Sequence, residues 1–259
     1  MTGSAGVMAV VLAQAVAGAT ALLFVGPLWG TVKMGFFKLT GSVILVLAAA
    51  AWLTARAGAV PGVEAGRWSV TLAGAGAAAT ALWVSALFAR RESVARAIGM
   101  LTVPLTIATL VSLSFTARQS WPIALLQLLG GAAFLGAVID GLLLGHWYLT
   151  DRGLTREPIN WYTDALIVAV VLEAAAVVLG GFDAVGPSRE FNPLLTAGAL
   201  APWIALGMVA ATALIAVLVR LTLRGARSSA VQAATGFFYL AVVTAFTAEV
   251  AAKIRFLPA

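Results

Sequence analysis

The chain alternates between long apolar runs and short polar connections. A helix needs about 20 largely apolar residues to cross a bilayer, whereas a membrane strand needs only about ten residues that alternate in polarity. The runs in this chain are long and do not alternate. The pattern therefore predicts an all-α, polytopic membrane bundle of about eight transmembrane helices, forming a single transmembrane domain over residues 1–259. The expected spans are about 5–26, 36–55, 68–89, 94–115, 121–149, 161–181, 196–221 and 230–253.

Composition excludes a soluble globular domain. Hydrophobic residues make up 62% of the chain and charged residues 10%, where about 25% charged residues is usual in soluble domains. The connections between the apolar runs are too short to build a separate core. The N-terminal run has no basic segment before it, so we expect a retained first helix and not a cleaved signal. The lipid bilayer is the first partner that the sequence predicts.

Lysine and arginine residues are distributed unequally between alternate connections, which predicts an orientation. Cytoplasmic connections carry an excess of these residues. Both termini are therefore expected outside the cytoplasm of a bacterial inner membrane. The first, third, fifth and seventh connections hold Lys33, Lys38, Arg90, Arg91, Arg96, Arg152, Arg156, Arg220, Arg224 and Arg227, and the opposite side holds Arg56, Arg67, Arg118, Arg189, Lys253 and Arg255.

Charge and cysteine content exclude several classes of function. The net charge of +6 is spread over all connections and forms no basic stripe of the kind that a nucleic acid requires. The chain has no cysteine, so thiolate metal sites and iron–sulfur clusters are excluded. With a single histidine, bis-histidine ligation of haem by this chain alone is disfavoured. We expect no metal site and no covalently bound cofactor.

Two acidic side chains lie deep inside apolar runs. Asp140 stands about nine residues, or roughly 14 Å, from the cytoplasmic end of the fifth span. Glu173 stands about twelve residues, or roughly 18 Å, from the same side of the sixth span. An ionisable group inside a membrane costs several kcal/mol and is a candidate for function. Because both acids are expected at similar depth, they are candidate proton-relay residues; the alternative is that each only ties helices together.

A histidine and three aromatic residues lie near the cytoplasmic end of the same helical hairpin. His146, Trp147, Tyr148 and Trp161 are candidate contacts for a quinone headgroup, because a histidine can exchange a proton with a quinol. An ordinary interfacial aromatic belt explains the same residues equally well.

Other polar residues in the spans have structural interpretations. Glu249 and Lys253 are spaced i,i+4 in the favourable order, which predicts an ion pair. Gln14 and Gln127 are expected to form hydrogen bonds between helices.

Two stretches resemble the NrfD/DmsC-type membrane anchor subunits of respiratory reductases. Their first helix carries a glutamine followed by glycine, as in LAQAVAG at 12–18, and their last helix closes as in GFFYLAVVTAFTAEVAAKIRF at 236–256. The resemblance implies eight spans and a quinone-reactive subunit partnered by cofactor-bearing subunits of a membrane complex. This chain lacks the histidine motif that such anchors carry after the first hairpin. The stretch LLLGHWYLTDRGL also resembles bacterial polytopic membrane proteins.

Three functions follow as hypotheses. The first is a quinone-interacting membrane subunit of a respiratory or electron-transfer complex, with a proton relay in the hairpin of the fifth and sixth spans. If it takes part in an enzyme, it is a quinone-reactive or non-catalytic subunit of an oxidoreductase. The alternative is a proton or small-solute transporter, which would also use the buried acids. The third is a structural scaffold or assembly subunit.

Overall fold

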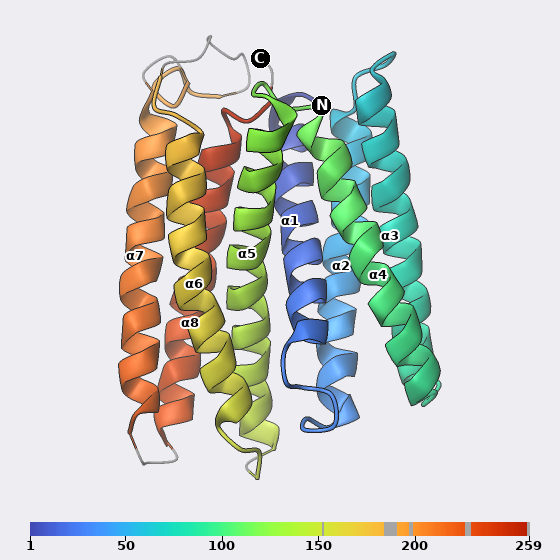
Figure 1. Ribbon diagram of the computed structural model, residues 1–259, viewed down its shortest axis with the longest axis vertical. Coiled ribbons are helices and arrows are strands. Elements are labelled where there is room, and N and C mark those ends of the chain that lie inside the picture. Colours follow the sequence, from blue (N-terminus) through green and yellow to red (C-terminus); the bar gives the residue numbers. More distant parts are fainter. Residues whose placement is uncertain (152, 184–190, 197–198, 226–228, 258–259) are drawn as a thin grey trace.

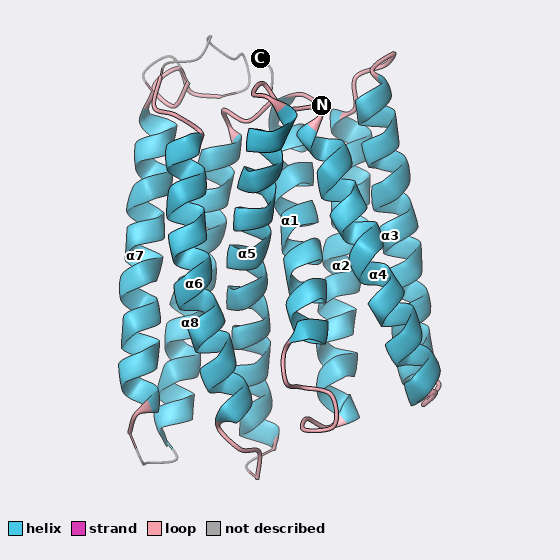
Figure 2. Cartoon of the chain, in the orientation of Figure 1, coloured by secondary structure: helices cyan, strands magenta, loops and turns pink. Residues whose placement is uncertain are grey.

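The described part of the chain forms eight helices (Figures 1 and 2), as predicted. The computed structural model describes residues 1–151, 153–183, 191–196, 199–225 and 229–257, and no strand occurs among them. Each helix is long and apolar enough to cross a membrane. The helices are α1 (Gly3–Val25), α2 (Met34–Gly58), α3 (Glu64–Phe88), α4 (Glu92–Ser114), α5 (Trp121–Thr150), α6 (Glu157–Leu179), α7 (Leu200–Leu223) and α8 (Ser229–Lys253).

The largest differences from the expected boundaries, four residues each, lie at the starts of α3, α6 and α7, and α3 begins at Glu64 and not at 68. Helix α6 begins at Glu157 and not at 161, so it takes in Pro158. A proline is tolerated in the first turn of a helix because no backbone hydrogen bond is required of its nitrogen there. Helix α7 begins at Leu200 and not at 196. Because α6 begins earlier than expected, Glu173 lies farther from the start of its helix than the sequence suggested.

The helices form two groups of four. In the first group α1 contacts α2 and α4, and α3 contacts both of those. In the second group α5 contacts α6 and α8, and α7 contacts both of those. The two groups meet mainly where α1 lies against α5, in the middle of the molecule (Figure 1). Helices α1 and α5 contain almost no charged residue and are hydrophobic on all sides, which is typical of helices surrounded by protein.

The two ends of the bundle carry different connections. The N-terminus, the C-terminal segment and the α2–α3 and α4–α5 connections lie at one end (Figure 1), which we call the terminal face. The α1–α2 and α5–α6 connections lie at the opposite face. The charge distribution predicts that the opposite face is cytoplasmic. Three of the residues in that prediction, Arg152, Arg189 and Arg227, lie outside the described residues.

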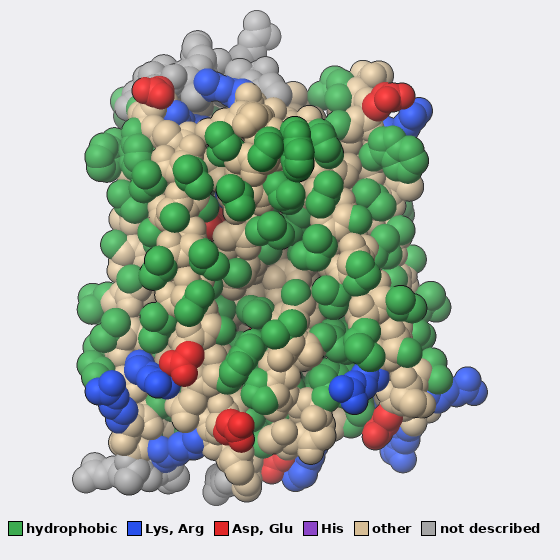
Figure 3. Space-filling model, viewed as in Figure 1, with side chains coloured by type: hydrophobic (Ala, Val, Ile, Leu, Met, Phe, Trp, Pro, Cys, Tyr) green, Lys and Arg blue, Asp and Glu red, His purple; other side chains and the backbone are tan. Residues whose placement is uncertain are grey.

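The surface has the polarity of a membrane protein. Hydrophobic side chains cover the middle of the visible face, and charged side chains gather toward its two ends (Figure 3). Large apolar side chains such as Val46, Leu101 and Val171 are 65–70% exposed on the outer sides of the helices. Lipid is the medium in which such a surface is stable. The chain is thus a multi-pass helical bundle that fits a lipid bilayer.

Candidate functional site

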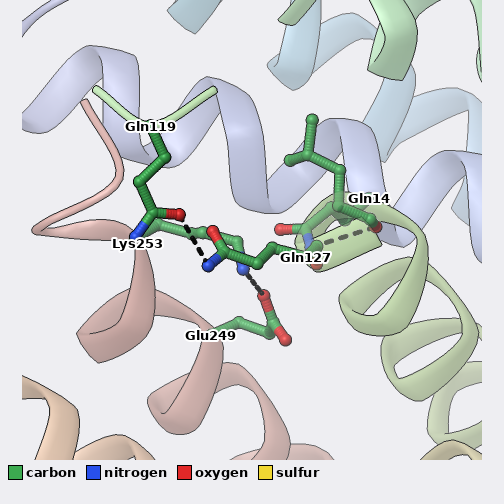
Figure 4. A network of polar contacts seen from close by, with 6 residues as sticks. Gln14, Gln119, Gln127, Glu249 and Lys253 are labelled. Atoms are coloured by element: carbon green, nitrogen blue, oxygen red, sulfur yellow. Dashed lines mark hydrogen bonds and ion pairs between the residues drawn. The ribbon is translucent and has the colours of Figure 1, made fainter. Parts of the chain in front are cut away.

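A buried ion pair lies at the end of α8. Nζ of Lys253 is 3.1 Å from Oε2 of Glu249, and the two side chains are 3% and 0% exposed. The residues stand one helical turn apart, so the predicted i,i+4 pair is confirmed. The ammonium group also lies 5.8 Å from the centroid of the Phe256 ring. Figure 4 shows this pair together with the glutamines around it.

Glu173 on α6 joins this ion pair and adds a second carboxyl group. Its side chain is completely buried, and its carboxyl group faces that of Glu249 at hydrogen-bond range. Neither oxygen of Glu173 accepts a hydrogen bond from an N–H or O–H donor in the described part of the chain. Two carboxyl groups can share a hydrogen bond only when one of them carries a proton. The cluster of Glu173, Glu249 and Lys253, which we call the acid–lysine cluster, therefore has one negative charge in excess or holds a proton.

Two adjacent glycines on α5 make room for the cluster. A methyl group on Gly130 would lie 3.3 Å from Oε2 of Glu173, and one on Gly131 would lie 2.6 Å from each carboxylate oxygen of Glu249. The same methyl group on Gly131 would collide with Nε2 of Gln14. Side chains from α1, α6 and α8 therefore converge on one point of α5.

Three glutamines lie around the cluster and bond to backbone carbonyls or to one another. Nε2 of Gln14 donates hydrogen bonds to the carbonyl oxygens of Gln127 and Leu128 on α5, at 3.3 and 3.2 Å. Nε2 of Gln127 donates to Oε1 of Gln119 at 2.8 Å, and Nε2 of Gln119 donates to the Gly180 carbonyl at 2.8 Å. The Gln14 bonds confirm the hydrogen bonds between helices that were predicted for Gln14. The Gln127 side chain bonds instead to a residue of the α4–α5 connection, so its predicted bond to another helix was wrong. Gln119 gave no signal in the sequence, because it lies in a polar connection where a glutamine is unremarkable.

A small cavity extends from the cluster toward the terminal face. Its volume is about 30 Å³, and its lining includes Glu173, Gln127, Lys253 and Arg255. A polar cavity of this size has room for water. Arg255 donates hydrogen bonds to the carbonyl oxygens of Gly181, at 2.5 Å, and Asp183. Burial and the nearby Arg118 lower the pKa of Arg255. The cavity between the acid–lysine cluster and the terminal face is therefore lined by polar as well as apolar side chains.

Asp140 occupies a different place. Its carboxyl group is completely buried. The Tyr162 hydroxyl lies 3.3 Å from Oδ2 of Asp140 and 3.1 Å from the Leu22 carbonyl oxygen. Oδ1 of Asp140 has no hydrogen-bond partner among the described residues. This acid is thus held where α5, α6 and the end of α1 meet.

The structure does not bring Asp140 and Glu173 together. Glu173 lies against Gly130, which precedes Asp140 by ten residues, or about 15 Å of helix. The expectation of similar depth assumed that α6 begins at 161. Because α6 begins at Glu157, Glu173 lies about 24 Å from that end of its helix, compared with about 15 Å for Asp140 on α5.

The four candidate quinone contacts are dispersed. His146 is exposed, whereas the Trp147 ring packs against Gly35 and lies edge-on to Phe36, with 6.3 Å between ring centroids. The Tyr148 hydroxyl donates a hydrogen bond to the Thr155 carbonyl in the connection that follows. Trp161 packs edge-on against Tyr162, with ring centroids 5.0 Å apart. Each of these three aromatic side chains therefore packs against, or bonds to, a residue other than His146.

No group of three or more His, Cys, Asp or Glu side chains among the described residues is arranged to hold a metal ion. No family model matches the chain, and no curated protein or solved structure matches it. The resemblance to the NrfD/DmsC-type anchors consequently rests on two stretches of sequence. The structure brings residues of those two stretches, Gln14 and Glu249, to the same point of α5.

Proposed function

We propose that this protein binds and moves protons within the membrane, and that the acid–lysine cluster is the proton-binding site. The observation that carries the proposal is the completely buried carboxyl group of Glu173, which faces a second carboxyl group and has no N–H or O–H donor among the described residues. Such an arrangement is costly inside a membrane, which makes it a candidate for function.

Charge balance explains why a proton belongs in this cluster. One ammonium group neutralises one of the two carboxylates, and a buried excess charge costs several kcal/mol. A proton held between Glu173 and Glu249 removes that excess. When the proton leaves, Lys253 remains next to Glu249 and stabilises the negative charge. The cluster can therefore exist in two states that differ by one proton.

The cavity supplies a route from the terminal face, and Asp140 with Tyr162 supplies a second proton-binding group farther along α5. Residues 132–139, which separate the two places on α5, are apolar or small. Protons do not cross such a stretch without water or polar side chains. Transfer across the bundle therefore requires a movement of helices, as in a transporter, and not a permanently open pore.

Proton flux in proteoliposomes tests this proposal. The purified chain is reconstituted with a trapped pH-sensitive dye, and a pH gradient or membrane potential is applied. We expect Glu173→Gln to reduce flux to the level of protein-free liposomes. Asp140→Asn should reduce it as well. The matched control is Glu64→Gln, because Glu64 is an exposed residue in the first turn of α3, and its flux should equal that of the unmodified protein. Equal flux in Glu173→Gln and Glu64→Gln would overturn the proposal.

A quinone-interacting subunit is the second candidate. It is favoured by the exposed position of His146 near the end of α5, where a headgroup in the bilayer could reach the imidazole. This function requires a partner that delivers electrons, because the chain has no cysteine and a single histidine. Copurification of subunits with haem, iron–sulfur or molybdenum signatures from the native membrane would favour this candidate over an independent transporter.

A further inference from the structure

The acid–lysine cluster and the adjacent Gln14 hold more unpaired buried oxygen atoms than a single shared proton can satisfy. Oε1 of Gln14, Oε1 of Glu249 and both carboxylate oxygens of Glu173 have no N–H or O–H donor among the described residues. The three side chains are each 0% exposed. A shared proton joins Glu173 to Glu249 but leaves the amide oxygen of Gln14 without a partner.

The side chains that carry these oxygen atoms come from three helices and lie beside two adjacent glycines of α5. The Gln14 amide and the Glu249 carboxyl group both lie against Gly131, and Oε2 of Glu173 lies against Gly130. The glycines leave the space that a side chain would otherwise fill. Figure 4 shows the Gln14 side chain, which comes from α1, near those of Glu249 and Lys253, which both come from α8.

The charge of the cluster determines which ligand suits these oxygens. With both carboxyl groups ionised, two negative charges stand beside the single positive charge of Lys253. A monovalent cation would make the cluster neutral, whereas a divalent cation would leave a buried positive charge. Carboxylate and amide oxygens are the ligands that hard cations prefer. A group of three acidic or histidine side chains, which the described residues lack, is not required for a singly charged ion that also binds amide oxygens and water.

We propose that Gln14, Glu173 and Glu249 form a binding site for a monovalent alkali cation, which competes with the proton. The inference rests on the proposed proton function, because the cation occupies the proton's place between the same carboxyl groups. Lys253 keeps Oε2 of Glu249 as its partner, so Oε1 is the oxygen available to the cation. Exchange of a cation for a proton would make the protein a cation–proton exchanger.

Gln14 distinguishes the two functions. A proton needs only the carboxyl groups, whereas the cation needs the amide oxygen as well. Gln14→Met keeps the size of the side chain and removes that oxygen. The control is Gln232→Met, because Gln232 is exposed on α8. A second variant, Gly131→Ala, places a methyl group among the ligands, and its control is Gly207→Ala, where nothing lies within 4 Å.

The test is thermal unfolding of the detergent-purified chain in NaCl, KCl or choline chloride at equal ionic strength. A ligand that binds only the folded state raises the melting temperature in a saturable way. We expect NaCl or KCl, but not choline chloride, to do so for the unmodified protein and for Gln232→Met. The shift should be absent in Gln14→Met and Gly131→Ala. Because each variant is compared with itself in choline chloride, a general loss of stability does not obscure the result.

Competition with the proton gives the shift a pH dependence. The cation needs ionised carboxyl groups, so its apparent affinity should fall by about tenfold for each unit by which the pH is lowered below their titration range. Equal melting temperatures in all three salts at every pH would overturn the cation site, and so would an undiminished shift in Gln14→Met.

Proton flux of Gln14→Met in sodium- and potassium-free buffer separates the two proposals. Retained flux leaves the proton function standing when the cation site fails, whereas loss of flux in Glu173→Gln is required by both.

Discussion

Gly18 of α1 and Gly136 of α5 lie in backbone contact. A methyl group on Gly136 would come within 2.6 Å of the Gly18 carbonyl oxygen, and one on Gly18 would collide with the carbonyl of Ala132. Small residues allow helices in lipid to approach this closely, where packing and not the hydrophobic effect drives association. The contact lies between the two groups of four helices and determines how they meet.

Gly136→Ala should therefore destabilise the bundle. The added methyl group meets backbone atoms, which cannot move aside as a flexible side chain does. Overpacking of this kind costs about 1–3 kcal/mol or more. The melting temperature in mild detergent measures the effect. Gly207→Ala, at a position with open space around it, should melt like the unmodified protein; a similar loss in both variants would show that the α1–α5 contact is not special.

The Glu249–Lys253 pair predicts a non-additive pair of substitutions. Removing one member of a buried ion pair costs about 3–5 kcal/mol, because the other charge is left uncompensated. Lys253→Met should accordingly lower stability in a titration with a denaturing detergent. The double variant Lys253→Met/Glu249→Gln leaves no unpaired charge from the pair and should be more stable than Lys253→Met alone. A double variant at least as unstable as the single one would contradict this expectation.

The orientation of the chain can be tested directly because it contains no cysteine. Ser93→Cys introduces a thiol at the start of α4 on the opposite face, and Gly62→Cys introduces one in the α2–α3 connection on the terminal face. Both positions are exposed. With the termini outside the cytoplasm, a membrane-impermeant maleimide should label Gly62→Cys in spheroplasts and label Ser93→Cys only after the membrane is permeabilised. The reverse pattern would invert the predicted topology.

His146→Ala tests the quinone candidate. Because the side chain is exposed, its removal should leave folding and any association with other subunits intact. Quinol turnover by the native membrane complex should be lost if His146 exchanges a proton with the headgroup. Tyr239→Phe, at a residue that is 52% exposed on α8, serves as the control. Turnover equal to that of the control would remove His146 from this role.

Local patterns were enough to predict the helices, because hydrophobic length along the chain is a local property. They were also enough for Glu249 with Lys253, since residues four apart on a helix are neighbours wherever the helix lies. The expected start of α6 was wrong by four residues, because Pro158 lies in the first turn of the helix, where a proline is accepted. That difference led to the wrong expectation that Asp140 and Glu173 lie at similar depth.

The sequence by itself determined that this chain crosses the membrane as eight helices and that its few buried polar residues would need partners. Only the tertiary structure decided which partners they have. Glu173 faces Glu249, which is 76 positions later, and Asp140 lies beside Tyr162. In nearly uniform runs of alanine, leucine and valine, the choice of neighbouring helices depends on small residues at points such as Gly18, Gly131 and Gly136. Their effect depends on how closely two backbones approach in space. The local sequence of one helix does not show which other helix approaches it.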